Sequence, residues 1–307
     1  MTRPLTGYAQ QPAKIRRIFL YTTSPRTREW FTAGMRDLGW IDGRNISVEA
    51  REGQEIDEEA LRLELRDRNP PVEVLVLGGA LRIRAAMKVT KTVPIVGIDL
   101  ESDPVASGFI KSLARPGANV SGVWMDLPEL AGKQLQLLRE AMPRVGRVAL
   151  LWDDRFGGPQ LSYAQAAAQA SNLTLFSAAI HDAAEVDNAI ERLFAQRPDA
   201  LLVLTSPTVF TSLARIAEVA RERRLPSICL FSTYADVAGL LSYGPQFPSM
   251  YRQLASYVHR ILKGAKVGDL PIERPSTFEL AINLKTANAI GLKIPQSLLL
   301  RANRLIE

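Results

Sequence analysis

A stretch that is neither helix nor strand divides this chain into two similar halves. It covers residues 103–126, and a strand–helix alternation lies on each side of it. Asp103 precedes a proline, which disfavours helical backbone at that position. Residues 115–117 read Arg-Pro-Gly, a turn composition, and residues 119–124 form an extended, β-branched run. The stretch therefore predicts a hinge between two lobes of similar construction.

Short apolar runs alternate with amphipathic segments in both halves. Strands are predicted at residues 17–21, 45–50, 72–77, 94–98, 147–152, 173–177, 200–204 and 227–231. Helices are predicted at 27–38, 57–68, 81–89, 128–141, 160–170, 184–194, 210–223, 248–262, 284–290 and 297–306, with Thr27 and Asp57 as N-caps. Strands joined through helices form parallel sheets with right-handed crossovers. The predicted fold class is α/β, with two doubly wound parallel-sheet lobes.

Composition excludes several kinds of protein. The 307 residues are 47% hydrophobic and 23% charged, which is typical of a globular chain of one large domain or two lobes. The net charge of +6 is spread over helix faces without a basic block interleaved with aromatics, so we expect no nucleic-acid partner. The single cysteine, Cys229, lies in an apolar run and is predicted to be a buried thiol.

The first residues carry no apolar core of signal-peptide length. Residues 1–14 are expected to form a flexible N-terminal segment. Two explanations compete: an export signal was removed or misannotated upstream, or the protein stays in the cytoplasm. We favour the first, because the rest of the chain keeps the pattern of a known family.

Three groups of residues carry a family resemblance. Residues 103–105 read Asp-Pro-Val, residues 113–122 read Leu-Ala-Arg-Pro-Gly-Ala-Asn-Val-Ser-Gly, and residues 130–133 read Leu-Ala-Gly-Lys. Further matches follow at residues 241–245, 261–266 and 278–287. In order and spacing the chain resembles, from about Ile15 onward, the substrate-binding proteins of ABC transporters, including the tryptophan/tyrosine-type components.

The resemblance implies a receptor rather than an enzyme. It implies the type I periplasmic-binding architecture, in which three crossings join the lobes. Residues 15–121 and 246–277 would form lobe 1, and residues 122–245 and 278–307 would form lobe 2. The implied protein is periplasmic or extracytoplasmic, monomeric and without a cofactor or metal. It would hold a small amino-acid-like solute between its lobes and present it to a membrane permease.

The ends of the predicted strands supply the candidate ligand contacts. In an open α/β sheet, ligands bind outside the carboxyl ends of the strands. These loops and one crossing provide the candidate binding residues: Tyr21, Thr22, Thr23, Ser24, Gly78, Gly79, Ala80, Asp99, Asp103, Asp153, Thr205, Ser206, Phe231, Tyr234 and Tyr243.

The chemistry of these loops suits a small zwitterion. Gly78 and Gly79 precede a helix whose first N–H groups attract a carboxylate. Asp99, Asp103 or Asp153 would pair with an amine. The tyrosines and the phenylalanine would flank an apolar or aromatic side chain. Each has a simpler reading as a helix cap, turn former or core residue.

Some positions depart from the family pattern. Ala80 replaces a hydroxyl residue, Ser102 replaces a glycine, and Asp153 replaces an asparagine. Arg26, Arg82 and Arg155 lie near the mouths of the predicted cleft. These changes weaken the assignment of an aromatic amino acid as the ligand and allow a more cationic or differently shaped solute.

No catalytic set assembles from the sequence. The two histidines, His181 and His259, lack metal-ligand spacing, and no P-loop or nucleophile elbow is present. A two-lobed glycosyltransferase-like enzyme is the leading enzyme alternative, because it shares the architecture. A cytoplasmic effector-binding module is the second alternative, although residues 1–14 are too short for a helix-turn-helix.

Overall fold

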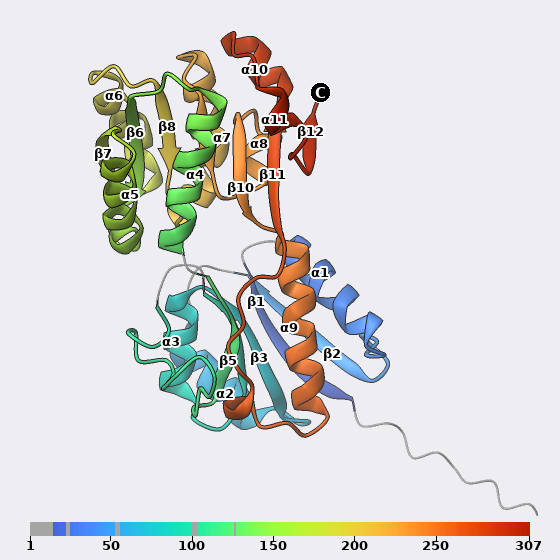
Figure 1. The fold of residues 1–307 in the computed structure, drawn as a ribbon. Coiled ribbons are helices and arrows are strands. Elements are labelled where there is room, and N and C mark those ends of the chain that lie inside the picture. Colours follow the sequence, from blue (N-terminus) through green and yellow to red (C-terminus); the bar gives the residue numbers. More distant parts are fainter. Residues whose placement is uncertain (1–14, 23–24, 53–55, 100–102, 126) are drawn as a thin grey trace, which may run out of the picture. The chain divides into compact units, whose positions relative to one another are not determined.

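The computed structural model describes residues 15–22, 25–52, 56–99, 103–125 and 127–307 (Figure 1). The predicted flexible segment, residues 1–14, lies outside the described residues. The chain folds into two units. Unit 1 contains the chain up to Ile98 together with Pro104–Val123 and Tyr251–Glu273, and unit 2 contains Asp99–Asp103, Trp124–Met250 and Arg274–Glu307. Parallel strands dominate the sheet of each unit, which confirms the predicted α/β fold class.

Unit 1 is built on a five-stranded sheet with the order β2-β1-β3-β4-β5. Its elements are β1 (Arg16–Thr22), α1 (Pro25–Asp37), β2 (Ile46–Glu52), α2 (Glu58–Asp67), β3 (Val72–Gly78), α3 (Ala80–Val89), β4 (Ile95–Asp99), β5 (Val120–Trp124), the short 3-10 helix η2 (Val267–Asp269) and the part of α9 (Phe247–Leu262) from Tyr251 onward. The ladders β1–β2, β1–β3 and β3–β4 are parallel.

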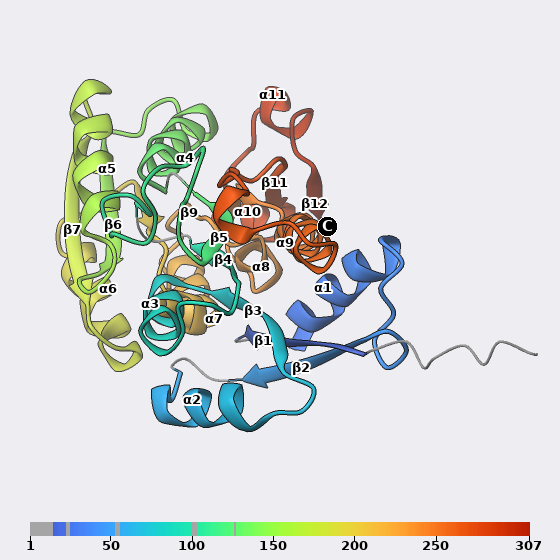
Figure 2. The ribbon, with the colours of Figure 1, turned by 90° about the horizontal axis from the view of Figure 1, so that it is seen from below.

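Helices cover both faces of the unit 1 sheet. Figure 2 shows α1 and α2 on opposite sides of strands β1 and β2. The apolar residues Ile18, Phe19 and Leu20 of β1 are fully buried beneath these layers. Helix α9 packs closely against α1, because a Cβ added at Gly34 would meet the Cα of Arg252 at 2.9 Å.

One glycine in the family motif permits a close backbone contact. Gly122 of β5 has a φ of +140°, and a Cβ added there would lie 2.1 Å from the carbonyl oxygen of Gly97 on β4. No side chain fits such a gap. The motif therefore encodes the pairing of the last two strands of this sheet.

Unit 2 is built on a seven-stranded sheet with the order β12-β11-β10-β9-β8-β6-β7. Its elements are α4 (Leu127–Ala141), β6 (Arg147–Asp153), α5 (Gly158–Ala170), β7 (Thr174–Ile180), η1 (Ala183–Glu185), α6 (Val186–Phe194), β8 (Ala200–Val203), α7 (Pro207–Glu222), β9 (Ser227–Cys229), α8 (Thr233–Asp236), β10 (Leu241–Pro245), β11 (Phe278–Asn283), α10 (Leu284–Ile290), α11 (Gln296–Leu299) and β12 (Arg304–Ile306). All neighbouring strands are parallel except β10 and β11.

The core of unit 2 lies between its sheet and the flanking helices. Leu138 of α4, Leu150 of β6 and Leu202 of β8 are fully buried in one cluster. Helices α4 and α5 pack side by side (Figure 1), with Gly132 of α4 close to Tyr163 and Ala167 of α5. Cys229 is buried, as predicted, and burial raises the pKa of its thiol to about 12, which makes it unreactive.

Two local predictions were wrong. Thr27 is not an N-cap, because α1 begins at Pro25, whose fixed φ suits the first turn of a helix. Residues 297–306 do not form a closing helix. Asn303 instead exchanges two hydrogen bonds with the backbone of Leu280, and the chain continues as β12 beside β11.

The same strand order occurs in both units. In unit 1 the first strand lies between the second and third, and in unit 2 β6 likewise lies between β7 and β8. Successive crossovers leave the central strand in opposite directions at this point, which is where open α/β sheets bind ligands. The loops after β1 and β3, and after β6 and β8, are therefore the candidate sites.

Candidate functional site

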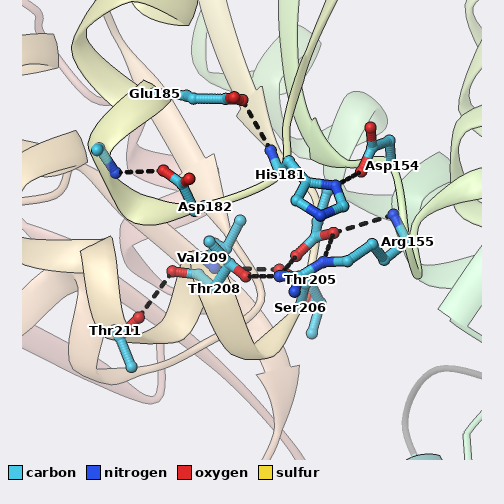
Figure 3. Close-up of polar contacts among 12 residues, drawn as sticks. Asp154, Arg155, His181, Asp182, Glu185, Thr205, Ser206, Thr208, Val209 and Thr211 are labelled. Carbon is cyan, nitrogen blue, oxygen red and sulfur yellow. Dashed lines mark hydrogen bonds and ion pairs between the residues drawn. The ribbon is translucent and has the colours of Figure 1, made fainter.

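The most elaborate polar cluster in unit 2 lies after β6 and β8 (Figure 3). Asp153 is the last residue of β6, and its side chain has no exposed surface. The guanidinium of Arg155 approaches it edge-on. Arg155 Nε donates to Asp153 Oδ1 at 3.2 Å, and Nη2 donates to Oδ2 at 3.1 Å. The backbone N–H of Arg155 also donates to Oδ1 at 3.0 Å.

This environment keeps Asp153 ionised. Burial by itself raises the pKa of Asp153, but hydrogen bonds involving Arg155, Thr208 and Ser206 outweigh that effect, so the pKa lies below its usual value. The hydrogen bond to Asp153 in turn raises the pKa of Arg155. The carboxylate of Asp153 is therefore neutralised within the unit, and the positive group that reaches the surface is Arg155.

A helix start fixes the loop after β8. Ser206 is the N-cap of α7, and its Oγ accepts from the backbone N–H of Val209 at 3.0 Å. Thr205 is held by Gln160 of α5, which donates to its carbonyl at 3.0 Å and accepts from its N–H at 3.1 Å. Thr208 accepts from Arg155 Nη2 at 2.5 Å, which joins this loop to the loop after β6.

Several acidic residues lie near Arg155 at the ends of β6 and β7. Asp154 Oδ1 lies 3.0 Å from His181 Nδ1. Glu185 accepts from the backbone N–H of His181 at 2.9 Å, and Asp182 caps Ala184 at 2.8 Å. These side chains are exposed, so the edge presents a cation and several carboxylates side by side (Figure 3).

The unit 1 candidates lie at the ends of β1 and β3. Thr22 is buried, and Tyr21 is half-buried with a pKa raised to about 12, chiefly by burial and then by Glu64. Gly78 ends β3, and Gly79 has a φ of +89° at the start of α3. This conformation favours glycine, so the pair performs a backbone role whether or not it meets a ligand.

Ala80 begins α3 and is buried at its first turn. Arg82, two residues further along α3, is also buried and donates from Nη1 to the carbonyl of Gly78 at 2.7 Å. The arginine that was expected at the mouth of a cleft therefore braces the end of β3 from within unit 1.

The aromatic candidates of unit 2 lie in its core. Tyr234 is fully buried and donates to Ser227 Oγ at 2.7 Å. Phe231 is buried between Phe210, at 4.9 Å between ring centroids, and Phe247, at 5.9 Å. Tyr243 is half-buried and stacks on Phe278 at 6.0 Å. Phe231 follows β9 as Thr205 follows β8, each two residues past the paired residues Cys229 and Val203, so both lie at the same end of the sheet.

The remaining candidates are Thr23, Ser24, Asp99 and Asp103. Thr23 and Ser24 lie outside the described residues, and the side chain of Asp99 at the end of β4 is outside the description. Asp103 is exposed.

Arg155 was predicted only to lie near the mouth of the cleft, and its contacts with Asp153 and Thr208, like those of Gln160, were not predicted. Arg155 and Asp153 are two residues apart on a turn, a spacing that carries no periodic signal. Gln160 reaches Thr205 from 45 residues away along the chain. The only available hint was a polar residue among alanines on the predicted helix 160–170.

The described residues contain neither a cluster of metal-binding side chains nor a membrane-spanning helix. Within them, no group of three or more His, Cys, Asp or Glu side chains is arranged to hold a metal ion. No helix in the described part of the chain combines the length and apolar character needed to cross a membrane.

A hollow of about 500 Å³ lies away from the strand-end loops. It follows the middle of β7, at the outer edge of the unit 2 sheet, and Arg192, Leu193 and Gln196 of the following helical region complete its lining. It contains none of the predicted site residues.

Comparison with known proteins finds similar proteins over most of the chain. A tyrosine-binding protein of Clostridioides difficile (strain R20291) is 24% identical over 270 residues, which are 87% of this chain and 77% of that protein. An ABC domain from Streptococcus pneumonia, solved in complex with L-Trp, has a TM-score of 0.82 at 22% identity and covers 95% of this chain and 100% of its own.

A conserved domain protein from Vibrio cholerae O1 biovar El Tor gives the same TM-score of 0.82, identity of 22% and coverage of 95% and 100%. At this identity both solved structures establish a shared fold. The family model described as ABC transporter substrate binding protein matches residues 23–306. Because that match spans nearly the entire chain, the protein belongs to the ABC transporter substrate binding protein family.

Proposed function

We propose that this chain is the solute receptor of an ABC importer and that its ligand is an amino acid or a similar small zwitterion. Family membership supports the receptor role. The ligand class draws support from relatives named for tyrosine or solved with L-Trp. The receptor would work outside the cytoplasmic membrane, as a monomer, and deliver its solute to a membrane permease without chemical conversion or nucleic-acid contact.

One observation carries the assignment of the site. At the topological switch point of unit 2, Asp153, Thr205 and Ser206 are buried and joined through Arg155 and Thr208 into one rigid polar edge. Polar groups held in fixed orientation at this point of an α/β sheet are the usual means of orienting a small ligand. The loops after β1 and β3 are the topologically equivalent positions in unit 1.

A thermal-shift screen of the refolded protein tests this function. The panel contains the standard L-amino acids, purines, small sugars and nucleotide sugars, and refolding removes any solute retained through purification. A ligand at 100 times its Kd stabilises the folded state by about 2.7 kcal/mol, a shift of a few degrees for a chain of this size.

We expect a selective shift with one class of amino acid and recovery of that amino acid unchanged by mass spectrometry after incubation. A response to nucleotide sugars with turnover would instead support the glycosyltransferase-like alternative. The absence of a thermal shift with every amino acid would refute the proposed ligand class.

A further inference from the structure

The guanidinium of Arg155 is held by hydrogen bonds through Nε and Nη2, whereas, among the described residues, its Nη1 is not. Its Nε and Nη2 are committed to Asp153 and Thr208, and its guanidinium carbon lies 5.3 Å from the centre of the Phe156 ring. In the part of the chain that the structure describes, Nη1 has no hydrogen-bond partner. The side chain is 41% exposed, so this free edge reaches solvent at the carboxyl ends of β6 and β8.

Asp153 determines where that free edge points. A guanidinium that is hydrogen-bonded along one edge keeps its remaining N–H groups in a fixed plane, since the group is flat and rigid. Asp153 is itself immobile, because it ends β6 and its side chain is enclosed by the unit. Arg155 is therefore preorganised to meet an anion, and Asp153 acts as its positioning residue.

The surrounding charges restrict which anion fits. Asp154 and Asp182 lie close enough to Arg155 to act on it electrostatically. Together with Glu185 they give the edge an excess of carboxylates, which repels a multiply charged anion such as a phosphate. A molecule with one carboxylate and one ammonium group meets both signs of charge.

We propose that the free Nη1 edge of Arg155 binds the carboxylate of the solute and makes Arg155 a specificity-determining residue for α-amino acids over their uncharged derivatives. This inference rests on the proposed function and deepens it. It also reverses the expected role of Asp153: its carboxylate is directed at Arg155 and leaves no added negative charge for a cationic solute.

Calorimetric titration of the full chain with matched probes tests the inference. The probes are L-tyrosine, L-tryptophan, L-leucine and L-arginine, each compared with its C-terminal amide, which keeps the ammonium group and lacks the carboxylate. A charge-assisted hydrogen bond corresponds to a change in affinity on the order of 10- to 100-fold. For the amino acid that binds, we expect the amide to bind weaker by that factor.

Variants separate Arg155 from other sources of carboxylate preference. Asp153→Asn combined with Arg155→Met removes both charges, so no buried charge is left unpaired. We expect the double variant to bind the amino acid and its amide with equal affinity. Arg221→Met, which removes an exposed arginine in the last turn of α7, is the matched control and should leave both affinities unchanged.

Equal binding of an amino acid and its amide by wild type would overturn the inference without any variant and would leave the proposed function standing. A carboxylate preference that survives in the double variant would also overturn it, because another group would then hold the carboxylate. If none of the amino acids in the screen binds, the proposed function fails and this inference fails with it.

Discussion

At the scale of single residues, Asp153 couples folding to pH. Its pKa in the folded protein lies below the ordinary value of 3.8, so the folded state holds the ionised form more tightly than the unfolded chain does. The resulting stabilisation is complete above pH 3.8 and is lost as the pH falls through the folded-state pKa.

We predict that Asp153→Asn lowers the free energy of unfolding by about 1 to 3 kcal/mol near neutral pH, because it removes a charge-assisted hydrogen bond. The partial exposure of Arg155 keeps the loss below that of a fully buried ion pair. Urea unfolding of wild type and variant at about pH 6 and about pH 3 measures the effect. The difference between them should shrink at the lower pH.

Asp154→Asn is the control for this prediction. Asp154 is the next residue along the chain, but its side chain is 46% exposed, and its contact with His181 lies at the surface. We expect its removal to change the free energy of unfolding by less than about 1 kcal/mol. An Asp153→Asn variant whose stability deficit is unchanged at about pH 3 would contradict the ion-pair account.

At the scale of elements, the loop between β8 and α7 depends on a helix elsewhere in the sequence. Gln160 of α5 is 3% exposed and satisfies both backbone groups of Thr205. Gln160→Leu leaves these groups buried without partners. We predict a loss of about 2 kcal/mol or more in the free energy of unfolding, and weaker binding of the amino acid found in the screen.

Gln165→Leu tests whether the effect comes from the Thr205 contact. Gln165 lies on the same helix but is exposed, so the same exchange there should change stability by no more than about 0.5 kcal/mol. Equal losses in the two variants would show that leucine is disfavoured in α5 generally, and would remove Gln160 from the account of the site.

The sequence predicted those elements whose own residues determine them. The period of apolar residues placed the strands and most helices, and Asp57 was identified as the N-cap of α2, where it accepts from the N–H groups of Glu59 and Ala60. Residues 300–306 were mispredicted as helix, because β12 exists only through its pairing with β11. Local propensity cannot report a partner strand that lies 23 residues away along the chain.

The same limit applied to the candidate site. Strand ends could be located from the sequence, so Asp153, Thr205 and Ser206 were predicted, and the structure places them in one cluster. The direction in which each side chain points could not be predicted from the sequence. Tyr234 was proposed as a ligand contact because it follows a strand, but its ring enters the core and its hydroxyl is bonded to Ser227.

At the scale of the whole molecule, the two units repeat one strand order: counted along the chain within each unit, the first five strands lie in the order 2-1-3-4-5. In each unit the loops after the first and third strands carry the candidate site residues. The units differ in charge chemistry. Gly78 and Gly79 offer backbone groups in unit 1, whereas Asp153 and Arg155 offer an oriented ion pair in unit 2. Binding at these edges is the central claim of the proposed function.

Hydrogen–deuterium exchange of the refolded protein, with and without the amino acid that gives the largest thermal shift, tests that claim most directly, because it locates the bound solute on the chain. We predict slower exchange in peptides covering residues 153–156 and 205–208, with a second protected region at 78–80. Exchange should be unchanged at residues 144–147, which lie at the amino end of β6. Protection confined to residues 176–179 and 192–196, which line the hollow beside β7, would contradict it.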